Sequence, residues 1–342
     1  MIRPFVILAT VLFAAEAGAM SCQRTVTLAD IDSGTTSPTG QYRWMDVADN
    51  IYAESYRNSY NYTKADVSIY YTTDANMLYG TLSAGNLKPN FAYQVKLVGT
   101  PGTTSNELIG LTGRWWQEEW NGTTWVNGQN LNNKGDGLSP NPNDAVYFSR
   151  RDVNDPTSPT GKHYCFTGYL VFDYFITDAN GDATVAFEMD SSYHVLWKTS
   201  QRAHTPDDGP IESAVFDPDP CSAAYDTDYG VSSAEVYGEW ERLPVGGVYL
   251  PSGEYDVAFL LTEESFHSCG TQYGGCWAAA MSGAAYFSIP VCIVDLNELD
   301  ILTEEWLMTG DELVFDLDDT NDVDFYDYSI LAFYWLECCP QW

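Results

Sequence analysis

The sequence predicts a mainly β protein, in which a β-sandwich over residues 25–290 precedes a small α-helical module over residues 291–342. Two stretches predict the sandwich, YQVKLVG from Tyr93 and YDVAFLL from Tyr255, because apolar and aromatic residues recur in them at every second position. That period is typical of half-buried strands. A loop-and-helix pattern that occurs twice after residue 290 predicts the helical module.

The chain begins with a predicted secretory signal peptide, residues 1–19. Arg3 precedes an apolar run, and small residues at Ala17 and Ala19 form a cleavage site. Neither this run nor any later stretch is long enough to cross a bilayer, so no membrane span is expected. We expect a protein that is secreted or held at the cell surface. Cys22 lies close to the predicted cleavage site, so the alternative is that the protein is a lipoprotein attached through this cysteine. A lipidated cysteine usually has an aliphatic residue three positions before it, and this chain lacks one there.

Charge and cysteine content exclude some classes of function. The 15 basic and 48 acidic side chains give a net charge of -33, which repels a phosphate backbone and disfavours nucleic-acid binding. Eight cysteines in an exported chain predict disulfides of open connectivity. Cys269 and Cys276 bracket a glycine-rich loop, while Cys292 stands at one end of the C-terminal module and Cys338 and Cys339 at the other. The chain has four histidines and no C-x-x-C pair, so the sequence gives little support for a zinc site.

Three local patterns describe the sandwich region. DANGD separates two apolar runs, and Asn180 with Gly181 is suited to the positive φ of a β-hairpin turn. LKPNFAY (87–93) and LPSGEY (250–255) each place a tyrosine after a leucine and a proline. They resemble the corner of fibronectin type III and other immunoglobulin-like sandwiches, which implies a tyrosine hydroxyl bonded to upstream backbone. One large sandwich and two smaller ones, immunoglobulin-like or jelly-roll, all remain open.

A stretch rich in Gly, Asn, Pro and Trp covers about 100–163 and is predicted to be a functional or loosely ordered insertion. Flat aromatic rings can bury the apolar faces of sugars, so its tryptophans are candidate carbohydrate contacts. These are Trp115, Trp116, Trp120 and Trp125. The competing interpretation is that they fill the core or pin the loop to it.

No catalytic residue is assigned. Glycoside chemistry needs two carboxylates that face one cleft. The pairs Glu118 with Glu119 and Glu263 with Glu264 are neighbours in predicted strands, so their side chains point to opposite faces. The sequence also contains no nucleophile-elbow, zinc-protease, P-loop or dinucleotide motif.

An acidic loop of twelve residues near the C-terminus predicts a calcium site. Ca²⁺ takes six to eight oxygen ligands, and such a loop supplies them from positions 1, 3, 5, 7, 9 and 12. The residues at these positions are Asp316, Asp318, Thr320, Asp322, Asp324 and Asp327. Asn321 at position 6 tolerates a left-handed turn, and Val323 at position 8 is an apolar anchor for a neighbouring loop. The alternative is that these aspartates only cap a helix.

The helix after the loop is the second copy of an internal repeat. VDLNELDILTEEWL (294–307) aligns without gaps on VDFYDYSILAFYWL (323–336). In this register Asp295 and Glu298 take positions 9 and 12, but the residues before them offer no carboxylate at positions 1, 3 or 5. We therefore expect two helices and one strong calcium site.

Paired loop-helix repeats of this kind resemble the dockerin type I module, over about the last 50 residues. The resemblance implies Ca²⁺ as cofactor, the six ligands above, and docking onto a cohesin-like or other surface protein. Phe325 and Tyr326 replace the family's usual Ser/Thr pair, so recognition is expected to differ from the usual form. Tyr326, Phe333 and Tyr334 exceed what a small helical core needs and are candidate partner contacts, with a purely structural role as the alternative.

The sequence thus predicts an exported, non-catalytic, calcium-binding protein for cell-surface attachment or extracellular assembly. The alternatives are an extracellular polysaccharide hydrolase or lyase, and a carbohydrate-binding module.

Overall fold

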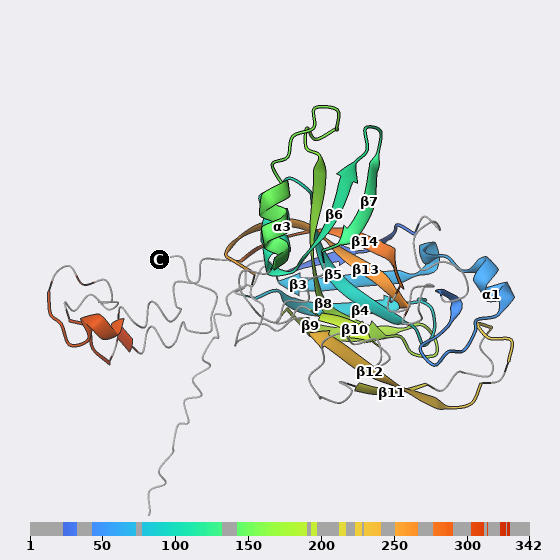
Figure 1. Cartoon of the computed structure of the whole chain (residues 1–342). Coiled ribbons are helices and arrows are strands. Elements are labelled where there is room, and N and C mark those ends of the chain that lie inside the picture. The colour runs from blue at the N-terminus through green and yellow to red at the C-terminus, as the bar shows by residue number, and fades with distance from the viewer. Residues whose placement is uncertain are drawn as a thin grey trace, which may run out of the picture.

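The computed structural model describes most of the predicted sandwich and a small part of the C-terminal module (Figure 1). The described residues are 23–32, 43–72, 77–131, 142–189, 193–196, 212–216, 223–227, 229–240, 250–265, 276–289, 302–310, 313, 322–325 and 327–328. This part of the chain is mainly β, as predicted. The predicted signal peptide lies outside it. Within the described ranges, no helix has the length and apolar character that a membrane crossing requires.

The strands form three antiparallel sheets. The first, in spatial order, contains β1 (Gln23–Thr27), β3 (Asp66–Thr72), β4 (Tyr79–Gly85) and β9 (Ala183–Glu188). The second contains β2 (Ala29–Asp30), β14 (Cys276–Ile289), β13 (Gly253–Ser265), β5 (Ala92–Gly99), β8 (Tyr164–Ile176), β6 (Arg114–Trp120) and β7 (Trp125–Asn130). The third contains β10 (Tyr193–Leu196), β12 (Ser232–Trp240) and β11 (Glu212–Phe216). The labelled helices are α1 (Glu54–Ser59), η2 (Tyr62–Lys64), α2 (Thr104–Thr112) and α3 (Pro142–Arg150), and residues 302–305 form a further helical turn.

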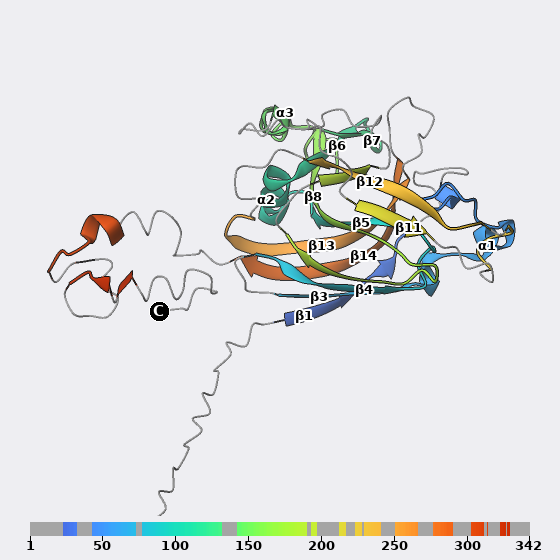
Figure 2. The ribbon, with the colours of Figure 1, turned by 90° about the horizontal axis from the view of Figure 1, so that it is seen from below.

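The main core lies between the four-stranded and the seven-stranded sheet, which Figure 2 shows as two stacked layers. Alternate positions face inward, such as Val67 and Ile69 on β3 and Val257 on β13. Each fully buried side chain of this kind contributes about 1.5–3 kcal/mol to folding. The same apolar cluster contains residues from Leu28 to Ile289, so the four-stranded and the seven-stranded sheet share one core, an arrangement compatible with a β-sandwich.

The three-stranded sheet lies on the other side of the seven-stranded sheet, away from the main core (Figure 2). β10 contacts β8 and brings this third sheet close. As a result the alternating strand β5 is buried on both faces: Gln94 and Lys96 are as enclosed as Tyr93 and Val95. The prediction that this strand is half-buried is therefore wrong, because a third layer covers part of its polar face. We refer to the face of the seven-stranded sheet that bears Gln94 and Lys96 as the outer face.

Both predicted tyrosine corners are present as hydrogen bonds. The hydroxyl of Tyr255 donates to the carbonyl oxygen of Pro251 at 2.6 Å, four residues upstream. The hydroxyl of Tyr93 accepts the backbone N–H of Lys88 at 3.1 Å. Since each tyrosine is buried near the start of its strand, its hydroxyl fixes the angle at which the preceding turn enters the sheet.

The hairpin predicted around DANGD is wrong in its pairing. Gly181 does take a positive φ of 83°. However, β8 before the turn belongs to the seven-stranded sheet and β9 after it to the four-stranded sheet. The carbonyl of Gly181 accepts the N–H of Leu87 at 3.0 Å, and Leu87 lies in the β4–β5 connection, which crosses between the same two sheets. The turn therefore carries the chain across the sandwich instead of reversing it within one sheet.

The predicted turn-rich insertion, about 100–163, contains regular structure in its described part. It includes α2, β6, β7 and α3, and β6 and β7 extend the seven-stranded sheet beyond β8. RWWQEEW forms β6, and WVNGQN forms β7, so the asparagine and glycine of this stretch also take part in the sheet. The insertion is thus partly a structural extension of the sandwich.

A buried ionic network lies inside the sandwich around Glu263, near the end of β13. Its Oε1 accepts hydrogen bonds from Lys88 Nζ at 2.7 Å, Arg43 Nη2 at 3.0 Å and the hydroxyl of Tyr62 at 2.6 Å. Arg43 also pairs with Asp32, so two cations meet two carboxylates. Burial lowers the pKa of Lys88 to about 8, although Glu263 opposes the shift.

Alkaline pH is expected to destabilise the fold through its buried tyrosines. The hydroxyl of Tyr52 donates to the carbonyl of Pro89 at 2.5 Å, and burial holds its pKa well above the usual range. In the unfolded chain this hydroxyl ionises near pH 10. Above about pH 10 the unfolded state therefore binds fewer protons than the folded state, and the free energy of unfolding falls. The expected slope for this residue is about 1.4 kcal/mol per pH unit. Below that pH both states are protonated and the residue contributes no slope. Urea unfolding measured from about pH 9 to 11 should show that the free energy of unfolding falls less steeply with pH in Tyr52→Phe than in the original chain. Equal slopes in the two chains would contradict a raised pKa for Tyr52.

Candidate functional sites

The structure describes half of the predicted calcium ligands. Asp322, Asp324 and Asp327 are described, whereas Asp316, Asp318 and Thr320 lie outside the described residues. Asp327 is completely buried, and its Oδ2 accepts the backbone N–H of Asp324 at 2.8 Å. This contact reaches back three positions and is that of a helix-capping residue. Within the described ranges, no three metal-ligating side chains gather into a site.

A buried carboxylate at position 12 nevertheless fits the chemistry of calcium. Ca²⁺ prefers hard oxygen ligands, and a carboxylate can supply two of them. The backbone N–H of Asp324 donates to one oxygen of Asp327, Oδ2. Capping and metal binding are therefore compatible roles for this residue.

Val323 joins the loop to the end of the first repeat. Its N–H donates to the carbonyl of Met308 at 3.1 Å, and its carbonyl accepts the N–H of Leu307 at 2.8 Å. A β-bridge between Thr309 and Asp322 continues this pairing. Val323 is also fully buried, as an apolar anchor requires. The two repeats thus meet through backbone pairing as well as apolar contact.

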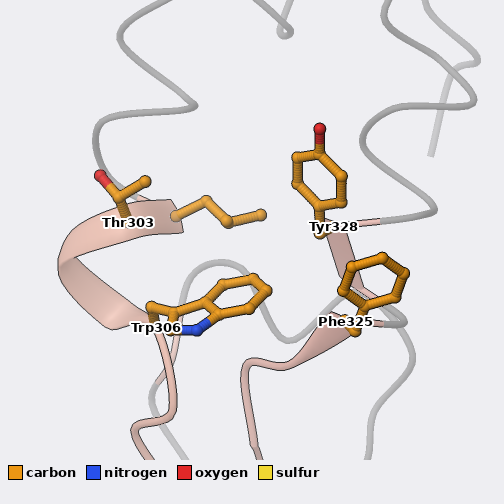
Figure 3. Close-up of a pocket in the computed structure, with 5 residues that line it drawn as sticks. Thr303, Trp306, Phe325 and Tyr328 are labelled. Atoms are coloured by element: carbon orange, nitrogen blue, oxygen red, sulfur yellow. The ribbon is translucent and has the colours of Figure 1, made fainter.

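An apolar hollow of about 440 Å³ lies between the same two segments (Figure 3). Trp306 stands on one side of it, and Phe325 and Tyr328 stand on the other. Its lining residues are Leu302, Thr303, Trp306, Phe325 and Tyr328. Phe325 is 70% exposed, which is unusual for so large an apolar side chain. Of the candidate partner contacts, Phe333, Tyr334 and the side chain of Tyr326 lie outside the described residues.

The four candidate sugar-binding tryptophans do not form one exposed row. Trp115 is 0% exposed and stacks on Tyr147, with ring centroids 3.9 Å apart and planes 10° apart. Its Nε1 donates to Asp144 at 3.1 Å. A Cβ added to Gly110 of α2 would lie 2.3 Å from the Trp115 ring, so a glycine is needed there for close approach. Trp115 therefore fills a core, as the competing interpretation held.

The other three tryptophans lie nearer the surface. Trp116 points to the face opposite Trp115 and is half-buried. Trp120 is buried and meets half-buried Trp125 edge to face, with centroids 5.2 Å apart. Trp116 and Trp125 are thus the two members of the set that keep partly accessible rings.

The sequence reasoning missed the polar side chains of the outer face. Gln94, Lys96, Arg114 and Thr262 come from β5, β6 and β13, and all are buried. The signal was present, because Gln94 and Lys96 occupy the polar positions of the alternating strand. Such positions are predicted to face water, whereas the structure buries them.

Of the two predicted carboxylate pairs, the structure describes the side chains of Glu118, Glu119 and Glu263, whereas the side chain of Glu264 lies outside the described residues. In the ladder with β8, Glu118 lies opposite Cys165 and Glu119 opposite Tyr164, and consecutive residues point to opposite faces. Glu263 is held in the ionic network and is completely buried.

Cys165 is a free, half-buried thiol whose pKa burial raises. Of the cysteines proposed for disulfides, Cys269, Cys292, Cys338, Cys339 and the side chain of Cys276 lie outside the described residues. Comparison of the chain with protein-family models, curated proteins and solved structures gives no match. Function is therefore inferred from the residues and contacts described above.

Proposed function

We propose that this is an exported, non-catalytic protein that attaches its β-sandwich to a surface or assembly partner through a calcium-dependent C-terminal module. The observation that carries the proposal is the backbone pairing of Val323 with Leu307 and Met308. It joins the acidic loop to the end of the first repeat, as expected if the two repeats fold as one unit. The buried carboxylate of Asp327 adds an oxygen ligand at the last loop position.

The hollow beside the loop supports a protein partner of the cohesin-like kind. Phe325 and Tyr328 flank Asp327 in the sequence, so ordering of the loop by Ca²⁺ would also fix these two rings against Trp306. Exposed aromatic groups of this kind are characteristic of interfaces. Calcium binding and partner docking would then be coupled through the same residues.

A calcium titration of the whole chain, followed by calorimetry, tests the proposal. We expect about one Ca²⁺ per chain, because six suitable oxygens occur in one loop only. Asp327→Asn should weaken binding at least about tenfold, since a neutral amide is a poorer calcium ligand but can still accept the hydrogen bond from Asp324. The change thus separates metal binding from helix capping.

The matched control is Asp66→Asn, which removes the same charge from an exposed position on β3. Its calcium affinity should equal that of the original chain. Two equally tight sites would show that the first repeat also binds the metal. No binding at millimolar Ca²⁺ would leave capping as the function of these aspartates and overturn the proposal.

A further inference from the structure

We propose that Asn121, in the turn between β6 and β7, is an N-glycosylation site at which an oligosaccharide is attached to the side-chain nitrogen Nδ2. The inference rests on the export part of the proposed function, because this modification belongs to the surface loops of secreted proteins. It does not depend on calcium or on the C-terminal module. The donor is an oligosaccharide linked to a lipid diphosphate.

The sequence motif for this modification is Asn-x-Ser/Thr, with any residue but proline in the middle. It occurs twice in the chain, as NYT from Asn61 and as NGT from Asn121. Because the motif is short, exposure and local geometry decide which copy a modifying enzyme can reach.

The second copy lies at the exposed end of a hairpin. Residues 121–124 connect β6 to β7, and all four are exposed. Figure 1 shows these two strands projecting from the rest of the sandwich. Gly122 has a φ of 97°, which glycine adopts without strain, and a Cβ added there would meet nothing within 4 Å. The turn is therefore tight and open to solvent, as an acceptor site requires.

The hydrogen bonds of Asn121 occupy the oxygen of its amide and leave the nitrogen free. Oδ1 accepts the backbone N–H groups of Thr123 and Thr124 and the hydroxyl of Thr123, each at 2.9 Å. Within the described residues, no hydrogen bond engages Nδ2. Since three donors hold Oδ1 against the turn, Nδ2 lies on the side of the amide away from them.

The hydroxyl of Thr123 also has a chemical role. An amide nitrogen is a weak nucleophile, because its lone pair is delocalised into the carbonyl group. The hydrogen bond from Thr123 to Oδ1 draws electron density toward the oxygen and makes the proton on Nδ2 easier to remove.

The transfer step forms one bond and breaks one. Nδ2 of Asn121 gives a proton to a base of the transferring enzyme and bonds to the anomeric carbon of the donor sugar. The bond from that carbon to the diphosphate oxygen breaks, and the lipid diphosphate leaves with the electron pair. The step involves no oxidation or reduction.

The first copy of the motif is less accessible in the folded chain. Asn61 and Thr63 are exposed, and the hydroxyl of Thr63 donates to Oδ1 of Asn61. Tyr62 between them is only 1% exposed, and its hydroxyl donates to Glu263 of the ionic network at 2.6 Å. An enzyme that binds the motif as a short separate segment would have to pull this ring out of the core. The folded chain therefore presents Asn121 and not Asn61.

Peptide mapping by mass spectrometry tests the proposal on the chain recovered from the exported fraction of the organism that encodes it. We expect a glycan on Asn121 and none on Asn61. Thr123→Val should lower the fraction of chains glycosylated at Asn121 at least about tenfold, because valine lacks the hydroxyl that the motif requires. Thr123→Ser should retain the modification, since it restores that hydroxyl.

Thr124→Val is the matched control, because it changes the neighbouring exposed threonine and leaves the motif intact. Its glycosylated fraction should equal that of the original chain. A bare Asn121 in chains that have lost residues 1–19 would overturn the site and leave export standing. A bare Asn121 in chains that keep residues 1–19 would overturn both. A glycan on Asn61 and none on Asn121 would also contradict the proposal.

Discussion

Replacing Glu263 with alanine is expected to lower the free energy of unfolding by about 3–5 kcal/mol, because removing one partner leaves a buried charge uncompensated. Oε1 of Glu263 accepts hydrogen bonds from Lys88, Arg43 and Tyr62, and the Lys88 ammonium is completely buried. Arg43 keeps Asp32 as a second carboxylate partner in this variant. Most of the expected loss of stability therefore comes from the buried ammonium of Lys88, which loses its carboxylate. Urea unfolding of both chains at neutral pH measures the effect.

Two further variants separate the buried charge from the simple loss of a side chain. Lys88→Met combined with Glu263→Gln removes both charges and should recover part of the stability lost by the single change. Glu254→Gln alters an exposed carboxylate of the same strand and should stay within about 0.5 kcal/mol of the original chain. A loss below about 1 kcal/mol in Glu263→Ala would show that the network contributes little.

Replacing Trp115 with alanine is expected to cost about 3–5 kcal/mol, as large-to-small changes of buried aromatic residues do. The change removes the stack on Tyr147, the edge contact with Phe166 and the hydrogen bond to Asp144. It also leaves a cavity beside Gly110, whose missing side chain had made room for the indole ring.

Trp116→Ala is the matched control, since the same residue type follows on the same strand but points to the other face and is half-buried. Its loss of stability should be less than half that of Trp115→Ala. Similar unfolding midpoints for the two alanine variants would contradict the placement of Trp115 in a core.

The sequence predicted those features whose cause is local. The corner tyrosines Tyr93 and Tyr255 follow from a proline turn directly before a strand, and both hydrogen bonds are present. The alternation in β13 identifies the residues that face the main core, such as Phe259 and Leu261. These patterns depend on neighbours within a few residues, so periodicity and turn chemistry are sufficient to find them.

Features that depend on distant partners could not be predicted in this way. Lys96 stands at a polar position of an alternating strand, which normally faces water, but a third sheet, whose first strand begins at Tyr193, lies on that side of the seven-stranded sheet. Trp115 and Trp116 have the same local composition, and only the packing of α2 and α3 decides which of them is buried. The loop from Asp316 carries the strongest chemical pattern, yet the structure describes three of its six proposed ligands.

The ionic network joins residues that lie far apart in the sequence. Glu263 and Arg43 are 220 residues apart in sequence, and the edge strand β2 pairs with β14, the last strand of the sandwich. The N-terminal strands therefore cannot complete their contacts until residues near the end of the sandwich have been synthesised. Such long-range pairing slows folding.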